Sequence, residues 1–211
     1  MSPSTSTSQS ATTGQSASQS ASAGPPANPA RLIADADERG LAATALACLE
    51  RCLPLLDPAV SGEALRPAWA GVARGGQGWA GRLDEARDDI PAATGTEDES
   101  AALVRRMLGA APTEWAAAPL RVWADECSLI ALDLHQRLCA TETASPDELE
   151  GWRSGGADGM GPLAAGELRR QVQVLEIFAD GAIGGLRRAL DISAEGQRVV
   201  RAVVSRRARG A

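Results

Sequence analysis

The chain has no lysine and no tyrosine, and it has one histidine and one phenylalanine among its 211 residues. Apart from that histidine, every basic residue is therefore an arginine. A single histidine gives no spacing against which Ser-His-Asp catalysis could be tested. No lysine follows the glycine-rich stretch at 151–161 and no predicted strand leads into it, so we interpret it as a connection and not as a phosphate-binding loop.

Long apolar runs and an export signal are also missing. No run approaches the roughly 18 apolar residues that a membrane-spanning helix needs. The first 28 residues carry no charged side chain, and they lack both the basic region and the apolar region of a signal peptide. We therefore expect a cytoplasmic protein with no membrane partner, in which the four cysteines are reduced thiols.

The sequence divides into a low-complexity segment and a longer mixed segment. Residues 1–28 consist mainly of Ser, Thr, Gln and Ala, so they have little to bury and predict a disordered tail. Residues 29–208 are enough for a single domain with a sizeable core. Helix signals recur in this segment and strand signals do not, which predicts an all-α fold. We expect a multi-helix bundle of about six or seven helices.

Local signals mark where several of these helices begin. Asn28 before Pro29 is typical of an N-cap followed by proline at the first helical position. The segments 96–99 and 145–148 each have the spacing of a capping box, and Ser193 is a further candidate N-cap.

Apolar periodicity indicates which helix faces are buried. Over 41–53 the apolar residues fall in one arc, which leaves Glu50 and Arg51 outside it. Over 114–140 an apolar stripe is accompanied by a separate polar face. That polar face contains Glu126, Asp133 and Arg137.

The strongest periodic signal is a heptad-like seam after Pro162. Apolar residues recur there at alternating steps of four and three, which predicts a long helix packed against another helix. The residues of this seam are Leu168, Val172, Leu175, Ala179, Ala182, Leu186 and Ala189. The middle of the seam is rich in glycine and alanine, which favours either close helix packing or a break in the helix.

Two pairs of soft ligands have the spacing of neighbours on a helix. Cys48 and Cys52 are four residues apart, and so are His135 and Cys139. If the two helices met, the four side chains could hold Zn²⁺ in a tetrahedral site or bind Cu⁺. Free cysteine is also common in helical cores, and Cys127 on the stripe centre is interpreted in that way. We expect structural thiols with no cofactor, and a thiol metal or redox site is the alternative.

A second candidate site is an acidic run with helical spacing. Asp84 and Asp88 form one i, i+4 pair, and Glu85 and Asp89 form another. Such carboxylates could bind Mg²⁺ in a helical enzyme that acts on a phosphorylated substrate. That chemistry needs a second acidic motif facing the first, and the sequence offers no clean one. A solvated acidic helix face is the simpler interpretation.

The charge distribution bears on possible partners. The formal net charge of −6 argues against nucleic acid as a partner, although the last helix is basic. No catalytic constellation is evident, whereas the seam and the uneven charge suit association between helices. We therefore predict a non-enzymatic helical interaction or regulatory module, which binds another protein or itself through helix faces. The alternatives are a thiol metal or redox protein and a Mg²⁺-dependent all-α enzyme.

Overall fold

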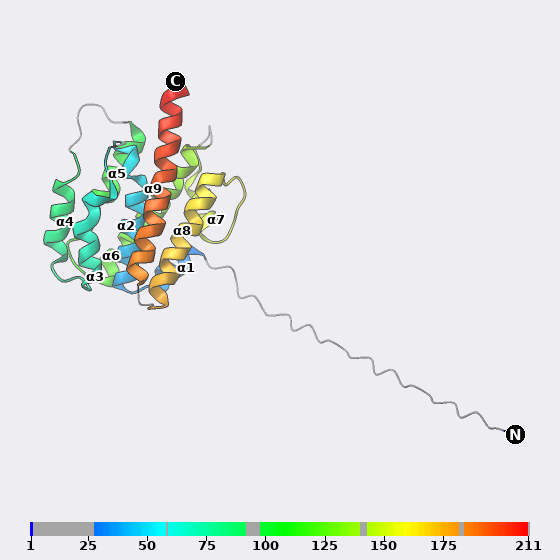
Figure 1. Ribbon diagram of the computed structural model, residues 1–211, viewed down its shortest axis with the longest axis horizontal. Coiled ribbons are helices and arrows are strands. Elements are labelled where there is room, and N and C mark those ends of the chain that lie inside the picture. Colours follow the sequence, from blue (N-terminus) through cyan, green and yellow to red (C-terminus); the bar gives the residue numbers. More distant parts are fainter. Residues whose placement is uncertain (2–27, 58, 92–97, 140–142, 182–183, 211) are drawn as a thin grey trace.

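A computed structural model of the protein describes Met1 and residues 28–57, 59–91, 98–139, 143–181 and 184–210. These residues form helices and no strand, which confirms the predicted all-α class (Figure 1). The predicted tail lies outside the described residues except for Met1 and Asn28. Nine α-helices are present in the described part, where six or seven were expected. They are α1 (Pro29–Asp35), α2 (Glu38–Cys52), α3 (Arg66–Ala73), α4 (Trp79–Asp88), α5 (Glu99–Gly109), α6 (Ala117–Arg137), α7 (Pro146–Arg153), α8 (Pro162–Ala179) and α9 (Gly185–Gly210), with two short 3₁₀ helices, η1 (Leu53–Leu55) and η2 (Gly62–Leu65).

Side-chain caps explain where several helices begin. Asn28 accepts a hydrogen bond from the backbone N–H of Arg31, and Ser145 and Glu148 form a reciprocal capping box, so both of these predicted starts are confirmed. Helix α5 begins instead after Asp98, which accepts from the N–H of Ala101 at 2.7 Å. The first residues of the capping box expected there lie outside the described residues.

Helix α2 is the central element of the bundle. It contacts α6, α8 and α9, and it also contacts α3 and α5 (Figure 1). Every residue from 40 to 52 is buried, because small side chains allow neighbouring helices to approach α2 from all sides. Glu50 and Arg51, which fall outside the apolar arc of the sequence, are therefore buried as well, and they are only 5% and 0% exposed.

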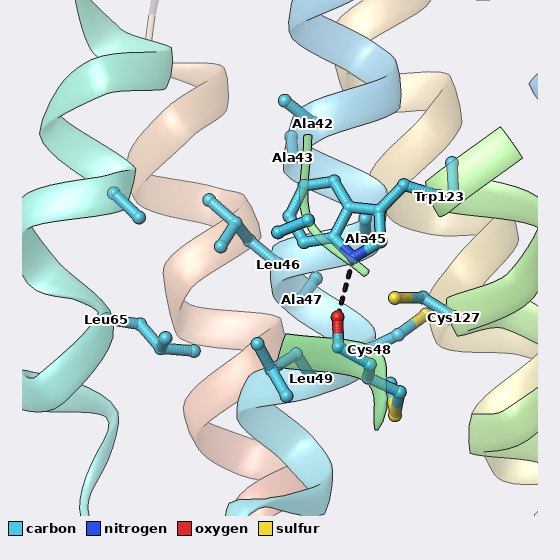
Figure 2. Close-up of a cluster of buried hydrophobic side chains, with 14 of the residues drawn as sticks. Ala42, Ala43, Ala45, Leu46, Ala47, Cys48, Leu49, Leu65, Trp123 and Cys127 are labelled. Atoms are coloured by element: carbon cyan, nitrogen blue, oxygen red, sulfur yellow. Dashed lines mark hydrogen bonds between the residues drawn. The ribbon is translucent and has the colours of Figure 1, made fainter. Parts of the chain in front are cut away.

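The core joins these helices through aliphatic, cysteine and tryptophan side chains. Leu46 and Leu49 of α2 lie towards Leu65, whereas Cys48 lies on the side of Cys127, as Figure 2 shows. Trp123 of α6 is buried and donates a hydrogen bond from Nε1 to the carbonyl of Met107 at 2.8 Å (dashed line in Figure 2). Helices α2, α5 and α6 thus share one core, in which the buried indole N–H is satisfied.

The expected long helix along the seam is divided in two. Helix α8 ends at Ala179, and Gly181 and Gly184 adopt positive φ angles before α9 begins. Glycine enters this region of backbone space without strain, so the small residues of the seam mark a break in the helix. Ser193 lies inside α9, where its hydroxyl donates to the carbonyl of Ala189, so its assignment as an N-cap was wrong. Ala182 of the seam is outside the described residues.

Helix α9 is the longest, with 26 residues, and its last turns extend beyond the neighbouring helices (Figure 1). Its C-terminal end carries exposed arginines, among them Arg206 and Arg209. Of the helices that the structure describes, none is both long enough and apolar enough to cross a membrane.

Candidate functional site

An ion pair lies in the centre of the bundle, where α2, α8 and α9 meet. Nε and Nη2 of Arg51 donate to the two carboxylate oxygens of Glu167 at 2.6 and 2.5 Å, and both side chains are 0% exposed. This bidentate geometry is the strongest form of an arginine–carboxylate pair. Gly196 of α9 packs against Arg51, since a Cβ at that position would overlap the arginine side chain.

The ion pair is part of a longer buried network. Gln171 donates to Glu167 at 3.0 Å and accepts a hydrogen bond from the hydroxyl of Ser128 at 2.6 Å, which links α8 to α6. Burial is the largest single effect and would raise the pKa of Glu167, but the charge of Arg51 and smaller effects, which include hydrogen bonds from Arg51 and Gln171, together lower it to about 2. The carboxylate is therefore ionised at neutral pH and is balanced inside the core.

His135 of α6 faces the same carboxylate. Its Nδ1 lies 2.7 Å from the carbonyl of Ala131 and therefore carries the proton of the neutral ring. Its Nε2 is 3.6 Å from Oε2 of Glu167 and has no hydrogen-bond partner among the described residues. Burial lowers the pKa of His135, although the nearby Glu167 carboxylate opposes this effect. His135 thus stands beside a buried charge as a neutral ring.

The four cysteines fall into two groups. Cys48, Cys52 and Cys127 are completely buried, whereas Cys139 is exposed just after the end of α6. Burial raises the pKa of Cys48 to about 12 and raises the pKa of Cys52 and Cys127 well above the usual value. These three side chains are therefore neutral thiols, which are poor nucleophiles and poor metal ligands.

The structure separates the two members of the second predicted ligand pair, His135 and Cys139. His135 points to Glu167 in the core, and Cys139, one turn later, is at the surface. Within the described ranges, no three His, Cys, Asp or Glu side chains are grouped in a way that could hold a metal ion. Binding of Zn²⁺ or Cu⁺ by Cys48, Cys52, His135 and Cys139 stays a prediction for metal analysis.

The acidic run lies on and just after α4. Asp84, Glu85, Asp88 and Asp89 are all exposed, and Asp84 pairs with Arg87 of the same helix at 3.1 Å. No acidic group of the described chain faces them closely enough to complete a metal site. The run is thus a solvated face in this structure, and Mg²⁺-dependent chemistry stays a prediction.

A surface groove lies between α5, α6 and α7 and has a volume of about 720 Å³. Its floor is made of aliphatic side chains from all three helices, and Val122 of α6 is 69% exposed at its edge. No large apolar side chain in the described helices is more exposed than Val122. The residues that line the groove are Leu103, Arg106, Val122, Glu126, Leu129, Ile130, Asp133, Arg137, Thr143, Ala144, Pro146, Leu149 and Glu150.

Charged side chains of both signs surround this apolar floor. Arg106 pairs with Glu126 at 2.6 Å between α5 and α6, and Arg137 pairs with Asp133 at 2.9 Å within α6. Arg137 also reaches Glu99 at 2.8 Å. An apolar centre inside a polar rim is the general anatomy of a protein–protein interface.

Part of this groove was predicted from the sequence as a polar helix face. The sequence pattern placed Glu126, Asp133 and Arg137 together on a polar face of α6, and all three line the groove. It missed Val122 and the apolar floor, because the floor is formed by three helices and no single helix carries its pattern. It also missed the Arg51–Glu167 pair.

The geometry of the structure is the basis for the function proposed below. No protein-family model, no curated protein and no solved structure matches this chain.

Proposed function

We propose that the protein is a non-enzymatic interaction module that associates with a second copy of itself through the groove between α5, α6 and α7. The single observation that supports this most is the apolar floor of the groove with the exposed Val122 at its edge. Exposed apolar surface with a polar rim is typical of association sites.

Two properties of the groove favour a second copy as its occupant. The edge presents a projecting apolar side chain beside a hollow, so a two-fold axis would place each Val122 in the groove of the other copy. The rim contains Arg106 and Arg137 together with Glu126, Asp133 and Glu150. Because both signs of charge are present, a copy related by a two-fold axis can bring opposite charges together across the interface.

The oligomeric state tests this proposal. Light scattering coupled to size-exclusion chromatography should give about twice the mass of one chain for the wild type. Val122→Asp should shift the protein towards monomer, because each copy loses the burial of a valine side chain, worth about 1.5–3 kcal/mol, and gains a charge to desolvate. Circular dichroism should be unchanged, since Val122 is exposed.

Ala80→Asp is the matched control. Ala80 is exposed on α4, and it does not line the groove. This variant adds the same charge and should stay dimeric. A wild-type protein that is monomeric at high concentration would overturn self-association. If both variants dimerised as strongly as the wild type, the dimer interface would lie outside the groove.

A further inference from the structure

A second pocket lies on the opposite side of α2 from the core it shares with α6, between η2, α3 and α9. Its volume is about 370 Å³, and Glu50 of α2 is among the residues that line it. We call it the Glu50 pocket, and its lining residues are Glu50, Ser61, Gly62, Glu63, Arg66, Trp69, Leu190, Asp191, Ala194 and Gln197.

The carboxylate of Glu50 is held in place and half-satisfied. Its Oε2 accepts a hydrogen bond from Nε1 of Trp69 at 2.8 Å. Its Oε1 lies against Gly62, where a Cβ would overlap the oxygen, so only glycine permits this close approach. Oε1 accepts no hydrogen bond from the residues that the structure describes, although Glu50 is only 5% exposed. Oε1 keeps some contact with solvent, since it is not among the described side-chain atoms that are both fully buried and without a hydrogen bond, so a donor group in the pocket can reach it.

Gln197 provides a second unused acceptor. Its Nε2 donates to the backbone carbonyl of Glu50 at 3.2 Å, and the residue is 6% exposed. Its Oε1 receives no hydrogen bond within the described part of the chain. The pocket therefore offers two acceptor atoms from side chains that are more than nine-tenths buried. A ligand that satisfies both must bring hydrogen-bond donors.

The charges around the pocket call for a cation. Glu63 and Asp191 add carboxylates to its lining, and the one cationic residue that lines it, Arg66, already pairs with Glu63 at 2.5 Å. Burial raises the pKa of Glu50 to about 7, against the opposing effects of the Trp69 hydrogen bond and the charge of Arg51. Arg51 itself is committed to Glu167. A positive charge beside Oε1, in addition to the nearby charge of Arg51, would stabilise the ionised form of Glu50.

The remaining walls suit an alkyl chain. Leu190 and Ala194 of α9 are half-buried, and the ring of Trp69 adds apolar surface. We propose that the Glu50 pocket binds an aliphatic diamine, with one ammonium group donating to Oε1 of Glu50 and Oε1 of Gln197. The alkyl chain lies along Leu190 and Ala194, and the second ammonium group meets the carboxylates of Glu63 and Asp191.

Titration calorimetry with 1,4-diaminobutane tests this assignment on the full chain. At about pH 8 both ammonium groups and the carboxylate of Glu50 are charged. The wild type should bind one equivalent saturably. Glu50→Gln should bind about tenfold more weakly or worse, because the charge-assisted hydrogen bond is lost while an amide oxygen can still accept from Trp69.

Two further variants keep the test decisive. Glu176→Gln makes the same substitution at an exposed position of α8 and should bind as the wild type does. Ala194→Leu fills the pocket without touching the carboxylate and should abolish binding, so it replaces Glu50→Gln if that variant does not fold.

Three ligands check the chemical class. 1,4-Butanediol has the same length without charge and should not bind. n-Butylamine should bind more weakly than the diamine, because it has no second ammonium group to meet the carboxylates of Glu63 and Asp191. Magnesium chloride at equal ionic strength should give no saturable heat. The proposal is overturned by no saturable binding of the diamine, by equal binding of the diol or of Mg²⁺, by equal affinity for the two amines, or by equal affinity in Glu50→Gln.

Discussion

Arg51 of α2 and Glu167 of α8, which are 116 residues apart in the sequence, form a bidentate ion pair that is fully excluded from solvent. The pair joins the central helix to α8, and Gln171 and Ser128 extend it to α6. Removing two charges from water is expensive, so such a pair contributes little net stability as a unit. Its larger effect is on specificity. Either charge would be costly if it were buried alone, so arrangements of α2, α6 and α8 that separate the two side chains are disfavoured.

A double-mutant cycle at this pair should show strong coupling. Glu167→Gln leaves the guanidinium of Arg51 buried without a counter-charge and should lower the free energy of unfolding by about 3–5 kcal/mol. Arg51→Met should have a similar effect, because it leaves the carboxylate alone. The double variant should be far more stable than the sum of the two losses, as measured by urea unfolding. Strict additivity would show that the two side chains do not act as a pair.

His135 should make the protein sensitive to mild acid. Burial lowers its pKa in the folded protein, whereas the unfolded chain takes up the proton near the usual value of 6.5. As the pH falls through about 6.5, proton uptake stabilises the unfolded state, so the stability supplied by the neutral ring is present above this pH and is lost below it. Unfolding free energies of the wild type and His135→Gln, measured between about pH 8 and 5, should differ by an amount that shrinks on the acid side. A constant difference would contradict this assignment. Comparing the two proteins cancels the contribution of Glu50, which changes with pH in the opposite direction.

Glu50 should destabilise the folded state as the pH rises. Its pKa is about 7 in the folded protein and near 4.5 in the unfolded chain, so the folded state holds a proton that the unfolded state has lost. Between about pH 4.5 and 7 this group therefore costs stability progressively, up to about 3 kcal/mol. Glu50→Gln cannot titrate, so it should become steadily more stable than the wild type over this range in urea unfolding. Glu176→Gln, at an exposed carboxylate of α8, should show no such trend. A trend of the opposite sign would mean that Glu50 is stabilised as an anion.

The sequence predicted what depends on local chemistry. The caps at Asn28 and Ser145 follow from hydrogen bonds that span three residues, and the all-α class follows from helical periodicity. The glycine-rich middle of the seam indicated either close packing or a break, and the positive φ of Gly181 and Gly184 decides for the break. These features are fixed within one or two turns of chain.

Features that depend on which helices surround a residue could not be predicted in this way. Arg51 has the pattern of an exposed residue, and it is buried only because Glu167 reaches it from a distant helix. Glu50 is buried for the same reason, since Trp69 and α9 cover it. The groove has the same origin, because α5, α6 and α7 each supply only part of its floor. A periodicity analysis treats each helix alone, so it assigns such charged residues to solvent.

The cysteines provide a chemical test of the predicted metal site. In the native protein Cys139 should react with Ellman's reagent within minutes, because it is exposed, and Cys48, Cys52 and Cys127 should react only on the timescale of unfolding. Burial raises the pKa of all three of these thiols, so little reactive thiolate forms at neutral pH. Unfolding in guanidinium should expose all four thiols, and Cys139→Ser should remove the fast phase alone.

Elemental mass spectrometry of the purified protein completes the test. About one equivalent of Zn²⁺ or Cu⁺ that is lost in His135→Ala would show that the two ligand pairs converge, and it would also slow the reaction of Cys139. A metal-free protein with one fast thiol is the outcome expected from the separation of Cys139 at the surface and His135 in the core.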